Sequence, residues 1–244
     1  MNAKMAFMTA TVLAGVLVVI FSSMQVAQAG EAAKRSIVLY TDTFFQEDCD
    51  FTSTGANRFF ILEPGYQQTL VGEVDGEEVE LVITVLDETK VVEGVETRVV
   101  EERESADNMQ VEVSRNYFAI CQQTNSVFYF GEDVDNYEDG EISDHDGSWL
   151  AGQDGARAGL IMPGTVLIGS RYMQEIAPDV AMDRAQVISM DNTVETPAGT
   201  FENVLKTRES TPLEKGYELK YYARGIGLIQ DADLKLKEYG LVDE

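Results

Sequence analysis

Apolar and polar residues alternate along much of the chain after residue 65. In the stretch 77–92, Val79, Leu81 and Ile83 fall on one face of an extended chain, and glutamate and threonine residues mostly fall on the other. A period of two is the pattern of a β-strand with one buried face. Asp75-Gly76 comes directly before this stretch and is a dipeptide favoured at the tip of a two-residue hairpin. The pattern therefore predicts antiparallel strands joined by tight turns.

The same alternation predicts about ten to eleven strands in all. We expect them within residues 66–74, 77–92, 95–105, 109–123, 126–134, 184–199, 200–210, 217–225 and 227–240, on either side of a glycine-rich middle at 140–170. Helical periodicity is nearly absent, and Pro178 limits residues 172–183 to one short helical turn. The predicted fold class is all-β: a single strongly twisted antiparallel sheet or a partly open barrel.

The first residues have the pattern of an export signal. Lys4 is followed by an apolar run at 5–21, and Ala27-Gln28-Ala29 forms an A-x-A cleavage site. The run is close to the shortest membrane span, so an uncleaved anchor remains the alternative. Cleavage predicts a periplasmic or extracellular protein without stable membrane insertion. We expect a signal peptide at 1–29, an irregular segment at 30–57 and a single β domain at 58–244.

The chain is strongly acidic. It has 43 acidic against 18 basic residues and a net charge of −25, which becomes −26 when Lys4 leaves with the signal. Such a surface repels nucleic acid, because phosphate binding needs basic patches. It attracts cations, which favours calcium binding, but a high net charge also serves solubility alone.

The two cysteines, Cys49 and Cys121, both remain after cleavage. Exported proteins fold in an oxidising compartment, where paired cysteines usually form a bridge. We therefore predict a Cys49–Cys121 disulfide. In the chain-entropy model, closing a loop of roughly 70 residues stabilises the folded protein by on the order of 4 kcal/mol. A redox pair is disfavoured because there is no C-x-x-C motif.

Several stretches together resemble a family of exported bacterial proteins with no assigned function. They read "NRFFILEPG", "VFYFGEDVDNYEDG", "GSWLAGQDGARAGLIMPG", "YMQEIAPDVAMDRAQVIS" and "ETPAGTFENVLKTRESTPLEKGYELKYYARGIGLI", and the match spans roughly residues 57–231. The resemblance implies an exported β-rich domain and brings no catalytic residues with it. The chain departs from the family pattern at Arg58, where proline is usual, and at Cys121, where a polar residue is expected.

Residues 131–147 hold eight carboxylates and His145, the single histidine of the chain. Calcium takes six to eight oxygen ligands, and a bound cation would relieve the repulsion among clustered carboxylates. The window from Asp135 imitates an EF-hand loop, but Tyr137 occupies a ligand position. The alternative is a solvated hairpin with Asp139-Gly140 at its tip. The candidate calcium ligands are Asp133, Asp135, Asp139 and Asp146.

His145 itself does not support a transition-metal site. Zinc and copper sites need several nitrogen or sulfur ligands, and the two cysteines are expected to be bridged. A catalytic triad is disfavoured as well, because neither Ser143 nor Ser148 lies in a G-x-S-x-G elbow. We expect a surface histidine with a raised pKa.

Aromatic residues mark a candidate ligand cavity. Phe128 to Phe130 are consecutive, which is typical of a strand covered on both faces. The second cover is either a packed loop or a ligand, and core packing is the more common case. The candidate lining residues are Trp149, Tyr129 and Tyr222.

Together these observations predict an exported, acidic, non-enzymatic β domain. We expect a binding or structural role at the cell envelope or outside the cell. The most specific version of this hypothesis is calcium binding. Unpaired sheet edges would allow self-assembly or pairing with an envelope protein. One alternative is a periplasmic carrier of a lipid or other apolar ligand, which requires an apolar concave pocket. Another is a hydrolase using two carboxylates with diverging pKa values.

Overall fold

The computed structural model describes residues 39–242. The predicted signal peptide lies outside the described residues. One short 3-10 turn, η1 (Gln46–Asp48), precedes a sheet of sixteen strands within this range. Among these residues no helix has the length and apolar character needed to cross a membrane.

The strands differ widely in length. In chain order they are β1 (Phe51–Thr52), β2 (Tyr66–Val74), β3 (Glu77–Val92), β4 (Val95–Ala106), β5 (Met109–Cys121), β6 (Ser126–Glu138), β7 (Glu141–Asp144), β8 (Trp149–Leu150), β9 (Arg157–Met162), β10 (Arg171–Met173), β11 (Glu175–Ile176), β12 (Arg184–Thr196), β13 (Gly199–Ser210), β14 (Glu218–Ala223), β15 (Gly227–Asp231) and β16 (Leu234–Leu241).

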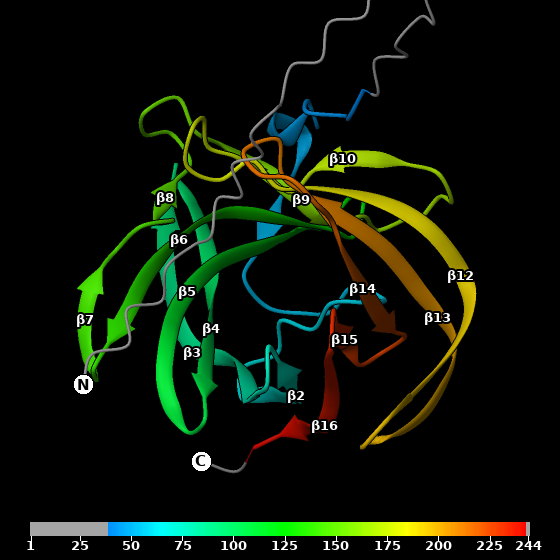
Figure 1. Ribbon diagram of the computed structural model, residues 1–244. Helices are drawn as coiled ribbons and strands as arrows, with labels where there is room; N and C mark the ends of the chain where they lie inside the picture. The colour runs from blue at the N-terminus through cyan, green and yellow to red at the C-terminus, as the bar shows by residue number, and fades with distance from the viewer. Residues whose placement is uncertain (1–38, 243–244) are drawn as a thin grey trace, which may run out of the picture. The chain divides into compact units, whose positions relative to one another are not determined.

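All of these strands belong to one antiparallel sheet. Its order is β10-β12-β13-β14-β15-β16-β2-β3-β4-β5-β6-β9-β11, with β1 beside β5, and β7 and β8 beside β6. The two end strands, β10 and β11, are separated in the chain only by Gln174, so the opposite edges of the sheet come together there. Figure 1 shows the sheet curving so that β3–β6 face β12 and β13 across an interior.

The predicted fold class is confirmed, but the strand count of about ten was too low. The long strands and their turns follow the predicted ranges closely. Asp75-Gly76, Glu93-Gly94 and Asp139-Gly140 all have positive φ angles at the tips of the hairpins β2–β3, β3–β4 and β6–β7. The additional strands are short pieces, mostly between residues 141 and 176, whose pairing depends on distant neighbours and leaves no alternating pattern.

Two glycines allow close contact between backbone segments where the sheet closes. A Cβ at Gly159 in β9 would overlap the main-chain carbonyl of Gln174, and a Cβ at Gly131 in β6 would overlap that of Trp149. Both contacts are with backbone, which cannot move aside as a flexible side chain can. These glycines let the short strands approach β6 and β9 closely.

The outer face of β6 is covered by the N-terminal segment. Phe128 and Phe130 are both almost fully buried. Phe44 and Phe51 pack edge-on against them, with ring centroids 5.3–5.9 Å apart. The consecutive aromatic residues therefore do belong to a strand covered on both faces.

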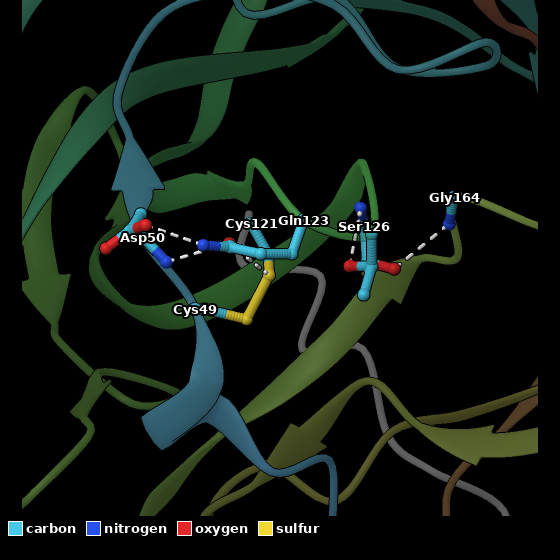
Figure 2. The surroundings of a disulfide bond; sticks show 7 residues. Cys49, Asp50, Cys121, Gln123, Ser126 and Gly164 are labelled. Carbon is cyan, nitrogen blue, oxygen red and sulfur yellow. Dashed lines mark hydrogen bonds between the residues drawn. A yellow bond between two sulfur atoms is a disulfide. The ribbon is translucent and has the colours of Figure 1, made fainter.

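The predicted disulfide between Cys49 and Cys121 is present, with Cα atoms 5.1 Å apart (Figure 2). It joins the segment before β1 to the end of β5, where Phe51 pairs with Cys121. Beside it, the Asp50 main-chain N–H donates to Gln123 Oε1 at 2.8 Å, and Gln123 Nε2 donates to Asp50 Oδ2 at 2.6 Å. The bridge thus fastens the N-terminal segment over the aromatic face of β6.

Candidate functional site: a charged interior with two cavities

Cross-strand pairing places charged residues on the inner face of the sheet. Lys220 of β14 lies opposite Thr207 of β13 and Asp231 of β15. Glu218, two residues before it, lies opposite Glu209. Residues directly opposite each other in an antiparallel pair have side chains on the same face. These side chains therefore form one continuous polar patch across β13, β14 and β15.

A second acidic group lies on β4, β5 and β6. Glu102 is paired with Ser114, and Glu132 is paired with Asn116, two residues further along β5. Glu102 lines a cavity together with Lys220, and Glu132 lines an adjoining cavity that also includes Lys220. The two sides of the curved sheet therefore present their charges to the same interior.

Lys220 is the central cation of this interior. Its Nζ lies 3.1 Å from Asp231 Oδ2 and 3.6 Å from Glu209 Oε2. Burial alone would lower the pKa of Lys220, but Asp231 and Glu209 outweigh it and raise that pKa well above its usual value. Glu209 also accepts hydrogen bonds from Thr207 Oγ1 at 3.0 Å and Tyr222 Oη at 3.3 Å. Lys220 therefore stays charged, and its charge is balanced by ion pairs with Glu209 and Asp231.

Other carboxyl groups of the interior are poorly compensated. Burial raises the pKa of Glu102 to about 7, partly offset by Lys220. Burial also raises the pKa of Glu132 to about 7, and neighbouring Glu102 adds to the effect. The pKa values of Glu175 and Asp183 are raised as well, again mainly by burial. Shifted carboxyl groups that gather in a cavity are typical of a functional site.

Two cavities adjoin at Lys220 and Glu209, which line both of them. The outer cavity, of about 380 Å³, is bounded by the loops before β12 and between β13 and β14. The inner cavity, of about 100 Å³, is mainly apolar. The charged groups lining the outer cavity are Glu132, Asp183, Glu209, Glu214, Lys215, Glu218 and Lys220. The apolar residues lining the inner one include Phe60, Ile83, Val85, Val100, Phe118, Ile161 and Leu228.

The three aromatic residues predicted to line a cavity have different positions. Tyr222 does line the inner cavity. Tyr129 is buried and stacks on Phe118, which lines it, with ring centroids 4.6 Å apart. Trp149 packs edge-on against Tyr129 and borders a separate hollow. One of the three thus faces the cavity, and the other two support it from outside.

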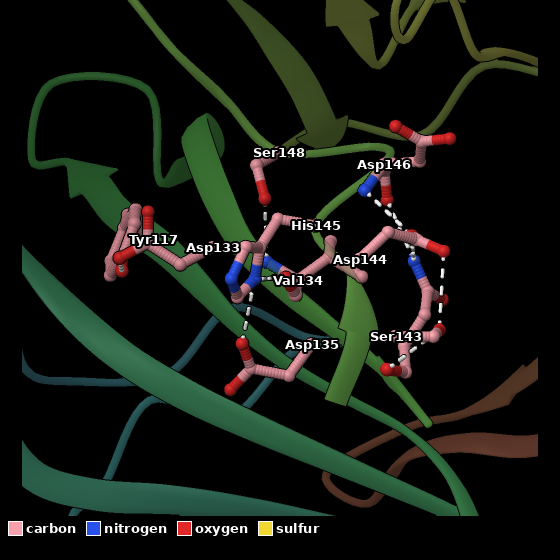
Figure 3. Close-up of polar contacts among 10 residues, drawn as sticks. Tyr117, Asp133, Val134, Asp135, Ser143, Asp144, His145, Asp146 and Ser148 are labelled. Carbon is pink, nitrogen blue, oxygen red and sulfur yellow. Dashed lines mark hydrogen bonds and ion pairs between the residues drawn. The ribbon is translucent and has the colours of Figure 1, made fainter. Parts of the chain in front are cut away.

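The acidic stretch at 131–147 forms a hairpin whose carboxylates have separate partners (Figure 3). Asp133 Oδ2 accepts from Lys90 Nζ at 2.8 Å and from Tyr117 Oη at 2.5 Å. Asp135 Oδ1 lies 2.9 Å from His145 Nδ1. Asp139 is at the hairpin tip, and Asp146 is exposed beyond β7. The structure therefore does not bring the four predicted calcium ligands together, and residues 39–242 contain no cluster of three or more His, Cys, Asp or Glu suited to a metal.

His145 is exposed on this hairpin, as the sequence indicated. Its Nδ1 also lies 2.9 Å from the Val134 carbonyl oxygen. That main-chain contact is the largest cause of its raised pKa, and Asp135 adds to the effect. Two acceptors near one ring nitrogen require that nitrogen to carry a hydrogen.

The sequence analysis missed the interior charges, among them Glu102, Glu132, Glu209 and Lys220. In β4 the stretch "EERE" is charged at four consecutive positions, so neither face is distinguished as inner. In β14, Leu219 and Tyr221 suggest that the opposite face is the buried one. The available signal was the alternation of Glu218, Lys220 and Tyr222, but it gains meaning only when the neighbouring strands are known.

Comparisons with known proteins add little to this geometry. No protein family and no curated protein matches the sequence. One similar solved structure is a Bacteroides fragilis protein described as exported and as having a YmcC-like fold; it is 19% identical, with a TM-score of 0.37, and the match covers 76% of this chain and 100% of that one. Another, from Parabacteroides distasonis, is described as a lipoprotein; it is 15% identical, with a TM-score of 0.38, and the match covers 77% and 100%. Neither likeness is strong enough to bear on function.

Proposed function

We propose that this chain is an exported, non-enzymatic binding protein that holds a small amphiphilic molecule inside its curved sheet. The observation that carries the proposal is the pair of adjoining cavities, one polar and one apolar, that meet at Lys220 and Glu209. Ligand sites combine an apolar lining with a few convergent polar groups, and a cavity of several hundred Å³ is their usual size. The alternative of a carrier therefore becomes the leading hypothesis.

The inner cavity limits the apolar part of the ligand. Its volume is about 100 Å³, whereas an engineered apolar cavity of about 150 Å³ holds a benzene ring. An aromatic ring or a short aliphatic chain is thus the expected size, after modest adjustment of the lining. A long acyl chain would extend into the charged outer cavity, so a whole lipid is disfavoured.

Two other roles are less well supported. Self-assembly by strand addition needs a free edge, but Thr41 pairs with both Arg171 and Met173 along the end strand β10. The other edge strands, β7 and β11, have only four and two residues. A hydrolase needs one carboxyl group as acid and another as base. Glu102 and Glu132 are both shifted upward, so these two do not divide into such a pair.

The test uses the uncharged fluorophore N-phenylnaphthylamine, whose emission rises in an apolar site. We expect saturable binding to the mature, oxidised protein. Ile83→Phe narrows the inner cavity and should weaken binding by about tenfold, since the ring competes for the same space. Val91→Phe is the matched control, because Val91 lies on the same strand and is 68% exposed. Absence of saturable binding, or equal binding by folded variants of both kinds, would refute the proposal.

A further inference from the structure

The outer cavity is lined by more acidic than basic side chains. Five carboxylates and two lysine ammonium groups line it, and one of those lysines, Lys220, is already paired with Glu209 and Asp231. In the described part of the chain, no ion pair involves Glu132, Asp183 or Glu218. The cavity would therefore stabilise a positive charge and repel a negative one.

Two buried polar groups point to a missing partner in the same interior. Tyr172 is 3% exposed, and its hydroxyl has no hydrogen-bond partner. Across the neighbouring strands, Tyr172 pairs with Ala185, Ala185 pairs with Glu209, and Glu209 pairs with Glu218. The side chain of Tyr172 is therefore on the face of the sheet that carries the acidic cavity. Asp231, which lines the inner cavity, likewise has an Oδ1 atom without a hydrogen-bond partner. Unsatisfied buried groups are rare and indicate a role such as ligand binding or an ordered water.

The raised pKa of a carboxyl group in the cavity agrees with a cationic ligand. Burial raises the pKa of Glu132 to about 7, and the neighbouring carboxylates Glu102 and Glu112 add to the effect. An added cation would favour the ionised form of Glu132, and an added anion would oppose it. Lys220 does not cancel this preference, because Glu209 and Asp231 together outweigh its charge.

We propose that the ligand is a small cationic amphiphile, an amine whose ammonium group lies among Glu132, Asp183 and Glu209 and whose ring or short chain occupies the inner cavity. This inference rests on the proposed binding function and adds the charge of the ligand. The carboxylates accept hydrogen bonds from the ammonium, and Tyr172 lies on the same face of the sheet as Glu209.

The experiment compares three molecules of nearly equal size: phenethylamine, which is cationic, phenethyl alcohol, which is neutral, and phenylacetate, which is anionic. Each is titrated against the N-phenylnaphthylamine complex in about 0.15 M NaCl, where the Debye length of about 8 Å suppresses attraction to the outer surface. We expect the amine to displace the fluorophore at about tenfold lower concentration than the alcohol, and phenylacetate to be the weakest.

Two variants locate the charge. Glu132→Gln and Asp183→Asn should each weaken the amine about fivefold and leave the alcohol unchanged, because only the amine uses the carboxylate. Glu195→Gln is the control, since Glu195 is exposed on β12 and this substitution also removes one carboxylate. Thermal melts verify that all variants are folded.

The outcomes separate this inference from the proposed function. If the fluorophore binds but phenylacetate or the alcohol displaces it as well as the amine does, the binding function stands and the cationic ligand is refuted. If the amine is preferred but Glu132→Gln and Asp183→Asn behave as Glu195→Gln does, the assigned position of the ammonium is wrong. If the fluorophore does not bind at all, the proposed function fails and the inference fails with it.

Discussion

Glu102 and Glu132 lie two strands apart on the inner face of the sheet, and both retain protons near neutral pH. Burial raises both pKa values from 4.5 to about 7. A carboxyl group with a higher pKa in the folded state takes up a proton on folding. Its contribution therefore favours the folded state fully below about pH 4.5 and is lost progressively as the pH rises from about 4.5 to about 7. Glu102 and Glu132 thus lower the stability of the unliganded protein at neutral and alkaline pH.

We predict that Glu132→Gln raises the melting temperature at pH 8 and leaves it nearly unchanged at pH 4, below the pKa of the carboxyl group in the unfolded chain. The neutral amide removes a poorly compensated charge, which contributes on the order of 1 kcal/mol, or about 3 °C for a domain of this size. The measurement is a thermal melt at both pH values. His145, whose pKa is also raised, loses stabilising charge over the same range in both proteins and cancels in the comparison. A lower melting temperature of the variant at pH 8 would show that Glu132 is compensated in the folded protein.

At the scale of elements, the N-terminal segment is fastened to β5 and β6 in two ways. Strand β1 contributes only two residue pairs with β5, so main-chain pairing alone holds it weakly. The disulfide crosslinks it over a separation of 72 residues, and the rings of Phe44 and Phe51 pack on β6. The covalent and apolar contacts therefore replace the hydrogen bonds that a longer strand would supply.

We predict that the double variant Cys49→Ser, Cys121→Ser is folded but less stable by about 2–5 kcal/mol, because a loop of this length is no longer closed in the unfolded chain. Hydrogen exchange should accelerate first in residues 44–52 and then in β6, which that segment covers. Urea titration and exchange mass spectrometry of the oxidised protein, with the variant alongside, measure both effects. Unchanged exchange at 44–52 would mean that aromatic packing holds the segment without the bridge.

For the whole molecule, net charge is the main electrostatic property. The chain carries 43 acidic and 18 basic residues, and few of the carboxylates form ion pairs in the described range. Repulsion among like charges is greater in the compact state than in the unfolded chain. The folded protein is therefore expected to be sensitive to ionic strength.

We predict that NaCl raises the melting temperature by about 3 °C between low salt and half-molar salt, equivalent to about 1 kcal/mol of screening. Calcium and magnesium chlorides at equal ionic strength should act alike, since Asp133, Asp135, Asp139 and Asp146 do not converge. The control is a melt with EDTA. A calcium increment beyond that of magnesium would restore a specific calcium site and contradict the separate partners seen for these residues.

The sequence alone determined the long strands, most turns and the disulfide. These features follow from local rules: a period of two selects extended chain, Asp-Gly selects a tight turn, and two cysteines in an oxidising compartment have one partner each. The hairpin at Asp139-Gly140 was predictable for the same reason. The calcium hypothesis was weaker because clustering in sequence does not imply convergence in space.

Only the tertiary structure decided which face of each strand became the interior. In β4 and β14 both faces carry polar or aromatic residues, so local pattern cannot assign Glu102 or Lys220 to the inside. The assignment comes from closure of the sheet, which depends on the short strands β9–β11 and on glycines that permit close backbone contact. Closure brings β4 and β6 to the same cavities as β14, and those cavities, with their uncompensated carboxylates, are properties of strands far apart in the sequence.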